Sequence, residues 1–313
     1  MSTMEPGAGR RPSEPGAGRP PWPASGSLTR ALVDDAAIFP PGNAVLDDAV
    51  RAHRGHRASW YGPAVGPLLV RLADATALHD LLDDEARLPV GLICPPGASA
   101  PDMERGITDV QHGGRARVRA VEQPVDDTAQ LRALVAVGRE HDALVWAEVS
   151  QACTLDGSLD DRLDDVRAAG ARAKYRTGGV RPEAFPTEQQ LARFVAACLA
   201  RSLPFKLTAG LHHAARHTAT GGPGQRDLEQ HGLLNVVTAV ASALDGAGEP
   251  DLVTLLADRD EGRVASAVAA LDDATVRRVR EAFSSFGCCG VTDPLTDLVT
   301  LGLLDRPADE EIS

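Results

Sequence analysis

The sequence is poor in aromatic residues and lacks any long apolar run. Aromatic residues make up 4% of the 313 residues, whereas apolar residues make up 43%. Alanine, valine and leucine must therefore fill the core, which suits helices packed closely on a sheet. Every apolar run falls short of the roughly 20 residues that span a membrane, and the N-terminus lacks the apolar segment of a signal peptide. These absences predict a cytoplasmic protein without membrane contact.

A basic patch and a regular cysteine pattern are also missing. The net charge is −12, and the absence of a Lys/Arg cluster argues against nucleic acid as a partner. The cysteines are odd in number and lack the spacing of a metal site, so they indicate a reducing compartment. They are Cys94, Cys153, Cys198, Cys288 and Cys289. The pair Cys288-Cys289 stands between glycines, which favours a buried turn over a redox pair.

Three segments of different composition divide the chain. Residues 1–28 are rich in Pro, Gly and Ser, and a segment of this kind cannot bury enough surface to order itself. We expect a disordered tail there, a single domain over residues 29–305, and a short C-terminal tail over residues 306–313.

Within residues 29–305, short apolar runs alternate with stretches of helical period. The expected helices include Thr128–Glu140, Leu159–Ala169, Thr187–Arg201 and Leu233–Leu244. The expected strands are Leu32–Phe39, Leu68–Leu72, Val90–Cys94, Arg117–Gln123, Ala143–Val149, Ala171–Arg176, Pro204–Thr208 and Leu252–Ala257. Eight strand-then-helix units predict an α/β fold, a (β/α)8 TIM barrel. An open doubly wound sheet is the alternative, but no strand runs into a G-x-G-x-x-G turn.

Two segments depart from the even repeat. Residues 210–230 follow the seventh strand and contain four glycines or prolines in succession, which predicts a mobile loop over the site. Residues 283–304 show a short helical pattern and are expected to cover one end of the barrel.

Lysine is nearly absent, and its two positions are therefore informative. Of 32 basic residues, only Lys174 and Lys206 are lysine, and both fall in consecutive predicted strands. Arginine stays protonated at any working pH, whereas an amine can lose its proton and attack a carbonyl carbon. Two neighbouring lysines would lower each other's pKa. The alternatives are electrostatic binding of an anionic substrate and a purely structural ion pair.

The residues that follow each lysine sharpen this expectation. Lys174 begins K-Y-R-T-G, with Thr177 and Gly178 in place, and Lys206 is followed by small residues up to Gly210. The two segments resemble the lysine strands of the deoxyribose-phosphate aldolase family of class I aldolases. That resemblance implies a barrel in which Lys174 forms an imine and Lys206 assists. No phosphate-binding turn is evident after strands seven and eight. The segments FPPG, KYRTGG and FKLTAGLHH also resemble an uncharacterised bacterial family, which implies no activity.

Carboxylates stand at the ends of neighbouring strands. Glu122, Glu148 and Lys174 are each one β/α unit apart, so a barrel would place them side by side at its C-terminal mouth, where these folds carry their chemistry. A carboxylate beside a lysine can shuttle protons, or it can simply balance the lysine's charge. Asp34 and Asp35 close the first predicted strand, where one of them either faces the mouth or serves a turn.

The remaining polar residues near strand ends, and two at the start of the helix after strand seven, are candidates for substrate binding. Arginines there can bind a carboxylate or a phosphate bidentately, and histidines can donate hydrogen bonds. These candidates are Arg71, Arg176, Thr177, Thr208, His212, His213, His231, Asn235 and Asp258.

These observations predict a lysine-dependent carbon–carbon lyase or aldolase that acts on a small oxygenated carbonyl compound, anionic or polyhydroxylated. Lys174, Lys206, Glu122 and Glu148 would be catalytic, and the scheme needs no cofactor and no metal. One alternative is a metal-assisted isomerase or hydrolase that uses Glu148, His212, His213 and Asp258. Another is a non-catalytic barrel that binds a small molecule. A homo-oligomer is possible in each case.

Overall fold

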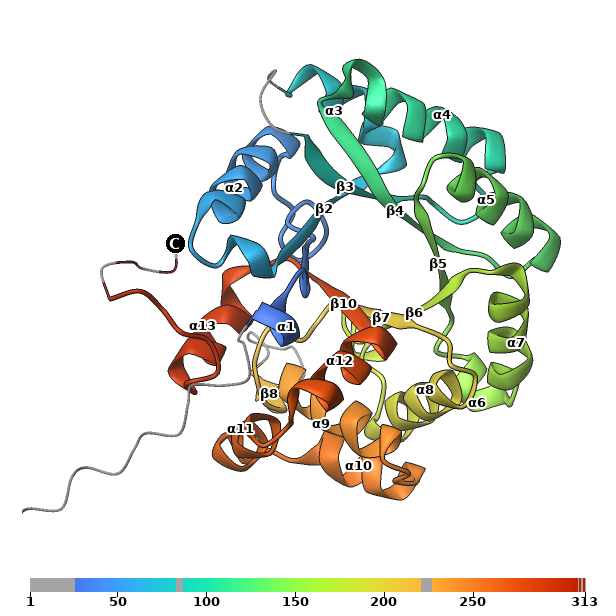
Figure 1. Cartoon of the computed structure of the whole chain (residues 1–313). Helices are drawn as coiled ribbons and strands as arrows, with labels where there is room; N and C mark the ends of the chain where they lie inside the picture. The colour runs from blue at the N-terminus through green and yellow to red at the C-terminus, as the bar shows by residue number, and fades with distance from the viewer. Residues whose placement is uncertain (1–25, 83–86, 221–226, 309, 311, 313) are drawn as a thin grey trace, which may run out of the picture.

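Eight parallel strands close into a barrel, with helices around its outside (Figure 1). The computed structural model describes residues 26–82, 87–220, 227–308, 310 and 312. The strands follow one another around the barrel in the order β1, β2, β3, β4, β5, β6, β7 and β10. The predicted (β/α)8 barrel is confirmed. Its strands are β1 (Val33–Asp35), β2 (Val65–Arg71), β3 (Leu88–Ile93), β4 (Ala116–Pro124), β5 (Leu144–Val149), β6 (Arg172–Arg176), β7 (Phe205–Thr208) and β10 (Phe283–Cys288).

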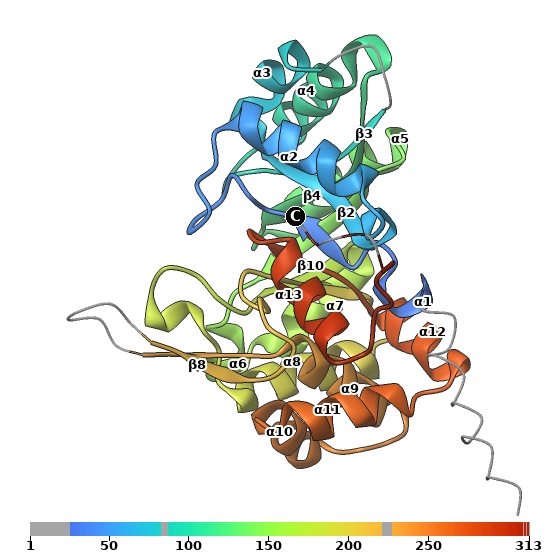
Figure 2. The same ribbon diagram turned by 90° about the vertical axis from the view of Figure 1, so that its left-hand side faces the viewer.

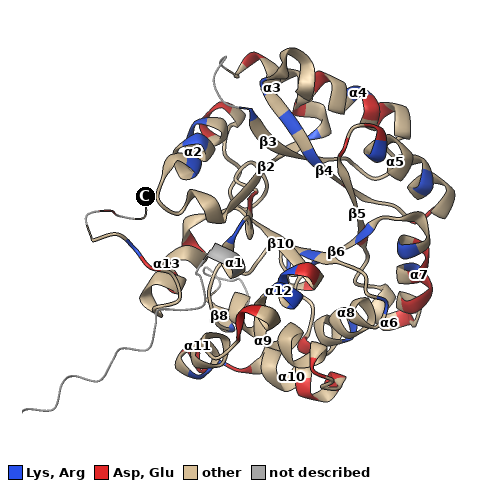
Figure 3. Ribbon diagram, viewed as in Figure 1, with Lys and Arg blue, Asp and Glu red and all other residues tan. Residues whose placement is uncertain are grey.

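The helices surround the strands and carry acidic and basic residues interspersed with each other (Figure 3). They are α1 (Gly26–Thr29), α2 (Leu46–Ala58), α3 (Ala75–Asp80), α4 (Ala100–Gln111), α5 (Thr128–Glu140), α6 (Cys153–Asp156), α7 (Leu159–Ala169), α8 (Glu188–Ala200), α9 (Leu233–Leu244), α10 (Glu249–Ala257), α11 (Glu261–Ala269), α12 (Asp273–Ala282) and α13 (Thr292–Thr300). Among the described residues, no helix is long and apolar enough to cross a membrane.

Local signals in the sequence set several helix ends. Thr187 caps α8 because its hydroxyl accepts a hydrogen bond from the Gln190 backbone, while the Gln190 side chain accepts one from the Thr187 backbone. This reciprocal pair satisfies two backbone N–H groups that a helix start leaves free. Gly170 ends α7 with φ at 81°, a conformation that glycine adopts without strain. Three of the four helices predicted above have the observed bounds, and the fourth begins and ends within one residue of them.

The eighth strand lies elsewhere than predicted. The run Leu252–Ala257 belongs to helix α10, and β10 closes the barrel between β7 and β1. A short apolar run has no period that separates a buried helix from a buried strand, so its assignment as a strand was wrong. In β10, Ser285 and Gly287 occupy positions where an apolar strand would carry large side chains. The helical pattern expected over residues 283–304 is therefore correct only for α13.

Between β7 and β10 the chain forms an antiparallel hairpin and the helices α9 to α12. The hairpin strands are β8 (His217–Ala219) and β9 (Leu228–Gln230). Figure 2 shows the hairpin projecting at the end of the barrel opposite to α1. The expected loop over residues 210–230 thus contains a hairpin, and residues 221–226 lie outside the described residues. Of the expected tail, residues 1–25 also lie outside them, and Gly26 begins α1.

The strand register brings the two lysines to one level of the barrel. Lys174 on β6 pairs with Lys206 on β7 and with Glu148 on β5. Because side chains alternate along a strand, Tyr175 points to the helix layer, where its ring stacks on Phe194 of α8. Lys174 therefore points into the barrel.

Candidate active site

Acidic and basic side chains alternate in a row across the barrel interior. Nζ of Lys174 lies 2.7 Å from Oε2 of Glu122 and 2.9 Å from Oε2 of Glu148. Nζ of Lys206 contacts Oε1 of Glu122 and lies 2.5 Å from Oδ2 of Asp34. Five strands contribute one side chain each to this part of the row. The sequence predicted four of the five members as catalytic, all except Asp34.

Glu122 occupies the centre of the row, between the two ammonium groups, and is fully buried. Burial alone would raise the pKa of its carboxyl group, but the two lysines together lower it to about 2. The two lysines are thus separated by a negative charge. The two ammonium groups therefore do not face each other directly in the way assumed from the sequence, because each contacts an oxygen of Glu122.

Lys206 lies at the deeper end of the row and is only 1% exposed. Burial would lower the pKa of its ammonium group, yet Asp34 and Glu122 raise it above the ordinary value. The Nζ atom also lies 5.8 Å from the centre of the Trp146 ring, within range of a cation–π contact. Burial raises the pKa of Asp34 more than Lys206 lowers it, and Ser285 donates a hydrogen bond of 2.8 Å to its carboxyl group. Lys206 is therefore held as a buried cation.

Lys174 lies on the other side of Glu122, where the row meets a cavity of about 790 Å³. Lys174, Glu122 and Glu148 line this cavity, whereas Lys206 and Asp34 lie behind them. Burial would raise the pKa of Glu148, but Lys174 and Arg176 lower it. A pocket of this size can hold a small organic molecule against the Lys174 amine.

Polar groups on the cavity wall surround the entrance to Lys174. Arg176 extends the charge row, since its guanidinium lies 3.3 Å from Oε1 of Glu148. Thr208 and Arg71 also line the cavity, together with His212. Arg71 donates a hydrogen bond to the Ile38 carbonyl and is partly exposed. Four of the predicted binding residues therefore line the same cavity as Lys174.

Thr177 and Gly178 join the loops that follow the two lysine strands. The hydroxyl of Thr177 donates a hydrogen bond of 2.6 Å to the Ala209 carbonyl. A Cβ atom at Gly178 would lie 2.8 Å from the backbone nitrogen of Gly210, so a glycine is needed there. Ala209, Gly210 and Leu211 all have positive φ. The T-G part of the motif thus holds the strand ends together, and Thr177 contacts backbone where binding of substrate was predicted.

Four predicted binding residues lie away from the cavity wall. His213 pairs with Asp297 at 3.2 Å and is half exposed. Asp258 follows α10, where it pairs with Arg263, because the segment before it is a helix and not a barrel strand.

The other two, His231 and Asn235, are buried in a structural network. His231 contacts the Pro186 carbonyl and Arg216, and burial lowers the pKa of its imidazole to about 4. The Asn235 amide accepts a hydrogen bond from the Arg216 backbone and donates to the Leu255 and Asp258 carbonyls.

The residues named for a metal site do not converge. Glu148 contacts cations, and His212, His213 and Asp258 have different partners. Within the described ranges, no group of three or more His, Cys, Asp or Glu side chains is arranged to hold a metal ion.

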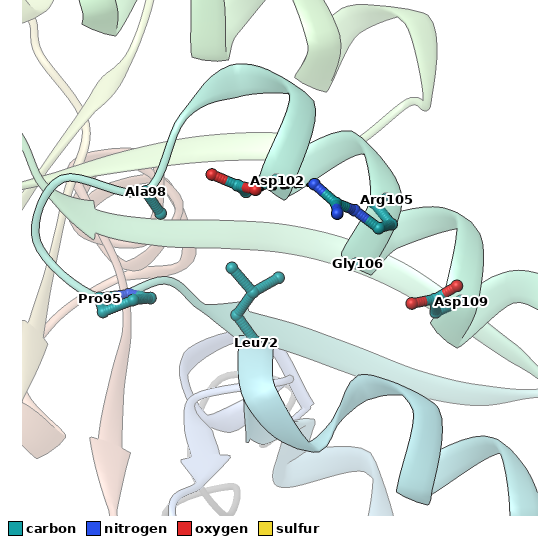
Figure 4. Close-up of a pocket in the computed structure, with 7 residues that line it drawn as sticks. All are labelled: Leu72, Pro95, Ala98, Asp102, Arg105, Gly106 and Asp109. Atoms are coloured by element: carbon teal, nitrogen blue, oxygen red, sulfur yellow. Dashed lines mark hydrogen bonds and ion pairs between the residues drawn. The ribbon is translucent and has the colours of Figure 1, made fainter.

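A second, smaller pocket of about 290 Å³ lies beside α4 (Figure 4). Leu72 faces the helix there, and Asp102 pairs with Arg105 at 2.7 Å. Asp102 also forms the capping box of α4 with Ser99. Two polar side chains of this pocket, Asp102 and Arg105, are therefore engaged in contacts within α4. No lysine is among the described residues that line the pocket.

Sequence reasoning missed Asp34 as a partner of Lys206, and it missed the contacts of His212 with Cys288, Cys289 and Asp293. The contacts of His212 could not be predicted because residues 283–288 were not recognised as a barrel strand. The position of the two cysteines at the mouth of the barrel was therefore unknown.

Comparisons with known proteins support the fold. No family model and no curated protein matches the sequence. Among solved structures, the fold is similar to deoxyribose phosphate aldolase from Aeropyrum pernix. That match has a TM-score of 0.50 and 11% identity, and it covers 88% of this chain and 93% of the aldolase. The aldolase family is the one that the two lysine segments resemble.

A further match is the carboxyl transferase domain of Rhizobium etli pyruvate carboxylase, with a TM-score of 0.41 and 13% identity. It covers 89% of this chain and 55% of that one. At 11% identity, the aldolase match supports the barrel architecture alone.

Proposed function

We propose that this protein is a lyase of the class I aldolase type, in which Lys174 forms an imine with a small oxygenated aldehyde or ketone. The observation that carries the proposal is the position of Lys174: one of two lysines, at the cavity wall, between two carboxylates. The fold that the chain shares with an aldolase is consistent with this chemistry, which the fold alone does not specify.

Glu148 is suited to move the protons of imine formation. Its Oε2 atom lies 2.9 Å from Nζ of Lys174, so it can accept the ammonium proton as a carbonyl compound displaces water from the cavity. The neutral amine then adds to the carbonyl carbon, and the same carboxyl group returns a proton as the carbinolamine loses water. The resulting iminium accepts the electron pair of the carbon–carbon bond when it breaks, and the Glu148 carboxylate takes the hydroxyl proton of the carbon that leaves as a carbonyl group.

The other charged residues hold this arrangement in place. Glu122 keeps Lys174 oriented from below, and Lys206 neutralises the far oxygen of Glu122. Lys206 is therefore a positioning residue in our proposal and does not touch the substrate. Arg176 and Thr208 line the same cavity and can donate hydrogen bonds to hydroxyl or carboxylate oxygens of the substrate.

Borohydride trapping tests the proposal. The purified protein is incubated with glycolaldehyde, glyceraldehyde, dihydroxyacetone or pyruvate, reduced with borohydride, digested and analysed by mass spectrometry. We expect an adduct on Lys174 with at least one of these compounds. Lys174→Arg is the matched variant, since a guanidinium keeps the positive charge of the row but forms no imine. Its adduct yield should fall at least tenfold, with an unchanged circular dichroism spectrum.

Two outcomes would contradict the proposal. One is an adduct that maps to Lys206 or to the N-terminal amine and not to Lys174. The other is saturable binding of a ligand that Lys174→Arg preserves while no compound of the panel is trapped, a result that supports a non-catalytic binding barrel instead.

A further inference from the structure

A second cluster of reactive side chains lies at the mouth of the same cavity. Nδ1 of His212 lies 2.7 Å from Oδ2 of Asp293, at the start of α13. Nε2 of the same imidazole lies 3.5 Å from Sγ of Cys289, directly after β10. A carboxylate only accepts hydrogen bonds, so Nδ1 carries a proton and Nε2 faces the thiol. The order carboxylate, imidazole, thiol is the arrangement that activates a cysteine nucleophile.

The backbone around the cluster is shaped for this contact. A Cβ atom at Gly290 would lie 2.2 Å from Oδ2 of Asp293, so only glycine leaves room for the carboxylate. Cys288 is fully buried, and its thiol donates a hydrogen bond of 3.2 Å to the Gly290 carbonyl. The two adjacent cysteines thus differ: Cys288 secures the turn, whereas Cys289 is partly exposed and lines the cavity.

The hydrogen bond with Asp293 raises the pKa of His212, and the two cysteine sulfurs contribute in the same direction. The raised pKa favours the imidazolium form of His212, and an imidazolium beside a sulfur stabilises a thiolate. His212 itself lines the cavity, and its side chain is 22% exposed.

Cys289 and Lys174 occupy different depths of the cavity. Gly287 on β10 is level with Thr208 on β7, and Thr208 is level with Arg176 on β6. Cys289 follows Gly287 by two residues, whereas Lys174 precedes Arg176 by two residues. The thiol is consequently nearer the mouth, and a molecule that enters the cavity meets it before the amine.

We propose that Cys289, His212 and Asp293 form a second reactive site, in which the Cys289 sulfur adds reversibly to the carbonyl carbon of a small aldehyde. The sulfur–carbon bond forms as the carbonyl π bond opens. The thiol proton passes to Nε2 of His212 and from there to the carbonyl oxygen, which gives a neutral thiohemiacetal and loses no atom. The activated thiol is independent of the proposed role of Lys174, and only the choice of aldehydes as the ligand class rests on it.

Alkylation kinetics test the activation of the thiol. Wild-type protein is treated with iodoacetamide, and the modification of each cysteine is followed by peptide mass spectrometry. Cys153 is the internal reference because it is also partly exposed. We expect Cys289 to react at least tenfold faster than Cys153, and both His212→Gln and Asp293→Asn to slow it at least fivefold.

His213→Gln is the matched control, because the adjacent His213–Asp297 pair has similar geometry but lies off the cavity wall. Its Cys289 rate should stay within twofold of wild type. A Cys289 rate equal to that of Cys153, or one that His212→Gln leaves unchanged, would overturn the activated thiol. A stoichiometric metal ion that His212→Gln releases would overturn it as well.

Glycolaldehyde as a competitor tests the ligand class. In the Lys174→Arg variant, where no imine can form at that position, glycolaldehyde should slow the alkylation of Cys289 at least threefold and leave Cys153 unaffected. Equal protection of both cysteines, or none, would contradict addition at Cys289. If protection occurs in the wild type but not in Lys174→Arg, the aldehyde binds only at Lys174, and aldehyde addition at Cys289 is refuted while the proposed lyase stands.

Discussion

Both oxygens of the Glu122 carboxylate contact an ammonium group, with Lys174 on one side and Lys206 on the other. A single carboxylate with two cationic neighbours in a fully buried position is sensitive to any change, because removal of one partner leaves an uncompensated charge in a medium of low polarity. The consequence can be measured in stability as well as in reactivity.

Glu122→Gln should lower the free energy of unfolding by about 3–5 kcal/mol at pH 7, since it leaves two buried ammonium groups without a shared counter-charge. Urea unfolding followed by circular dichroism measures the loss. Glu183→Gln, at an exposed position, is the control and should change the value by less than about 0.5 kcal/mol. A loss as small as that of the control would contradict the charge balance described here.

Glu122→Gln should also change how the free energy of unfolding depends on pH. The pKa of Glu122 in the folded protein, about 2, lies below the ordinary value of 4.5. Its stabilising contribution is therefore complete above pH 4.5 and disappears as the pH falls towards 2. The difference in unfolding free energy between wild type and Glu122→Gln should shrink by about 3 kcal/mol over that interval. A difference that stays constant with pH would indicate that the carboxylate is not stabilised by the lysines.

At the scale of elements, the ends of β6 and β7 are held together by backbone contacts. Gly178 approaches the Gly210 backbone so closely that a methyl group would have to displace it. The displacement moves the chain that follows each lysine. Local packing thus controls how the two strands present their side chains to the cavity.

Gly178→Ala should destabilise the fold by about 1–3 kcal/mol through overpacking, and it should reduce borohydride trapping at Lys174 more than tenfold. Gly55→Ala in α2 is the control: a methyl group there would meet no atom within 4 Å, and alanine is the better helix former by about 0.5–1 kcal/mol. Equal stability of the two variants would show that the β6–β7 contact is loose.

The sequence predicts these elements unequally. Seven of the eight barrel strands overlap their predicted ranges, because apolar runs between helix caps are a strong signal. The strand β10 carries Ser285 and Gly287 on its inner face, since Asp34 needs a hydroxyl partner there and Thr208 needs room. A strand with small polar residues facing inward has no hydrophobic period, so the sequence could not reveal it.

The sequence also predicts some residues of the candidate site and misses others. The scarcity of lysine identified Lys174 and Lys206, and barrel topology placed Glu122 and Glu148 beside them. The partner of Lys206, Asp34, lies 172 residues away in sequence, and only barrel closure brings the two together. Asp258 was chosen as the end of an eighth strand that is in fact a helix. His231 and Asn235 were chosen at the start of the helix after strand seven, and their contacts with Arg216 depend on a loop whose path the sequence does not reveal.

At the scale of the whole molecule, aromatic side chains are concentrated behind the lysine strands. The rings of Tyr175, Phe194, Phe205 and Phe283 contact one another in succession, with centres 4.4–5.6 Å apart. They come from β6, α8, β7 and β10. The chain has few aromatic residues. This cluster connects the two lysine strands, β6 and β7, to β10, which closes the barrel.

Phe205→Ala should lower the free energy of unfolding by about 3–5 kcal/mol, because it leaves a cavity among fully buried rings. Denaturant unfolding gives the value, and the variant should also lose trapping at Lys174. Phe39→Ala is the control, since that ring is only partly buried at the cavity wall, and its cost should be smaller. An equal cost for both variants would mean that the cluster adds no stability beyond ordinary burial.

The row of charges from Asp34 to Arg176 has a chemical consequence for the nitrogen of Lys174. An ammonium ion and a protonated imine carry the same charge, so a nitrogen that passes from one to the other leaves the electrostatics of the row unaltered. A modification that removes the charge, such as acetylation, would instead set the carboxylates of Glu122 and Glu148 against each other. Stable derivatives of this side chain that remain cationic should therefore cost less folding free energy than neutral ones.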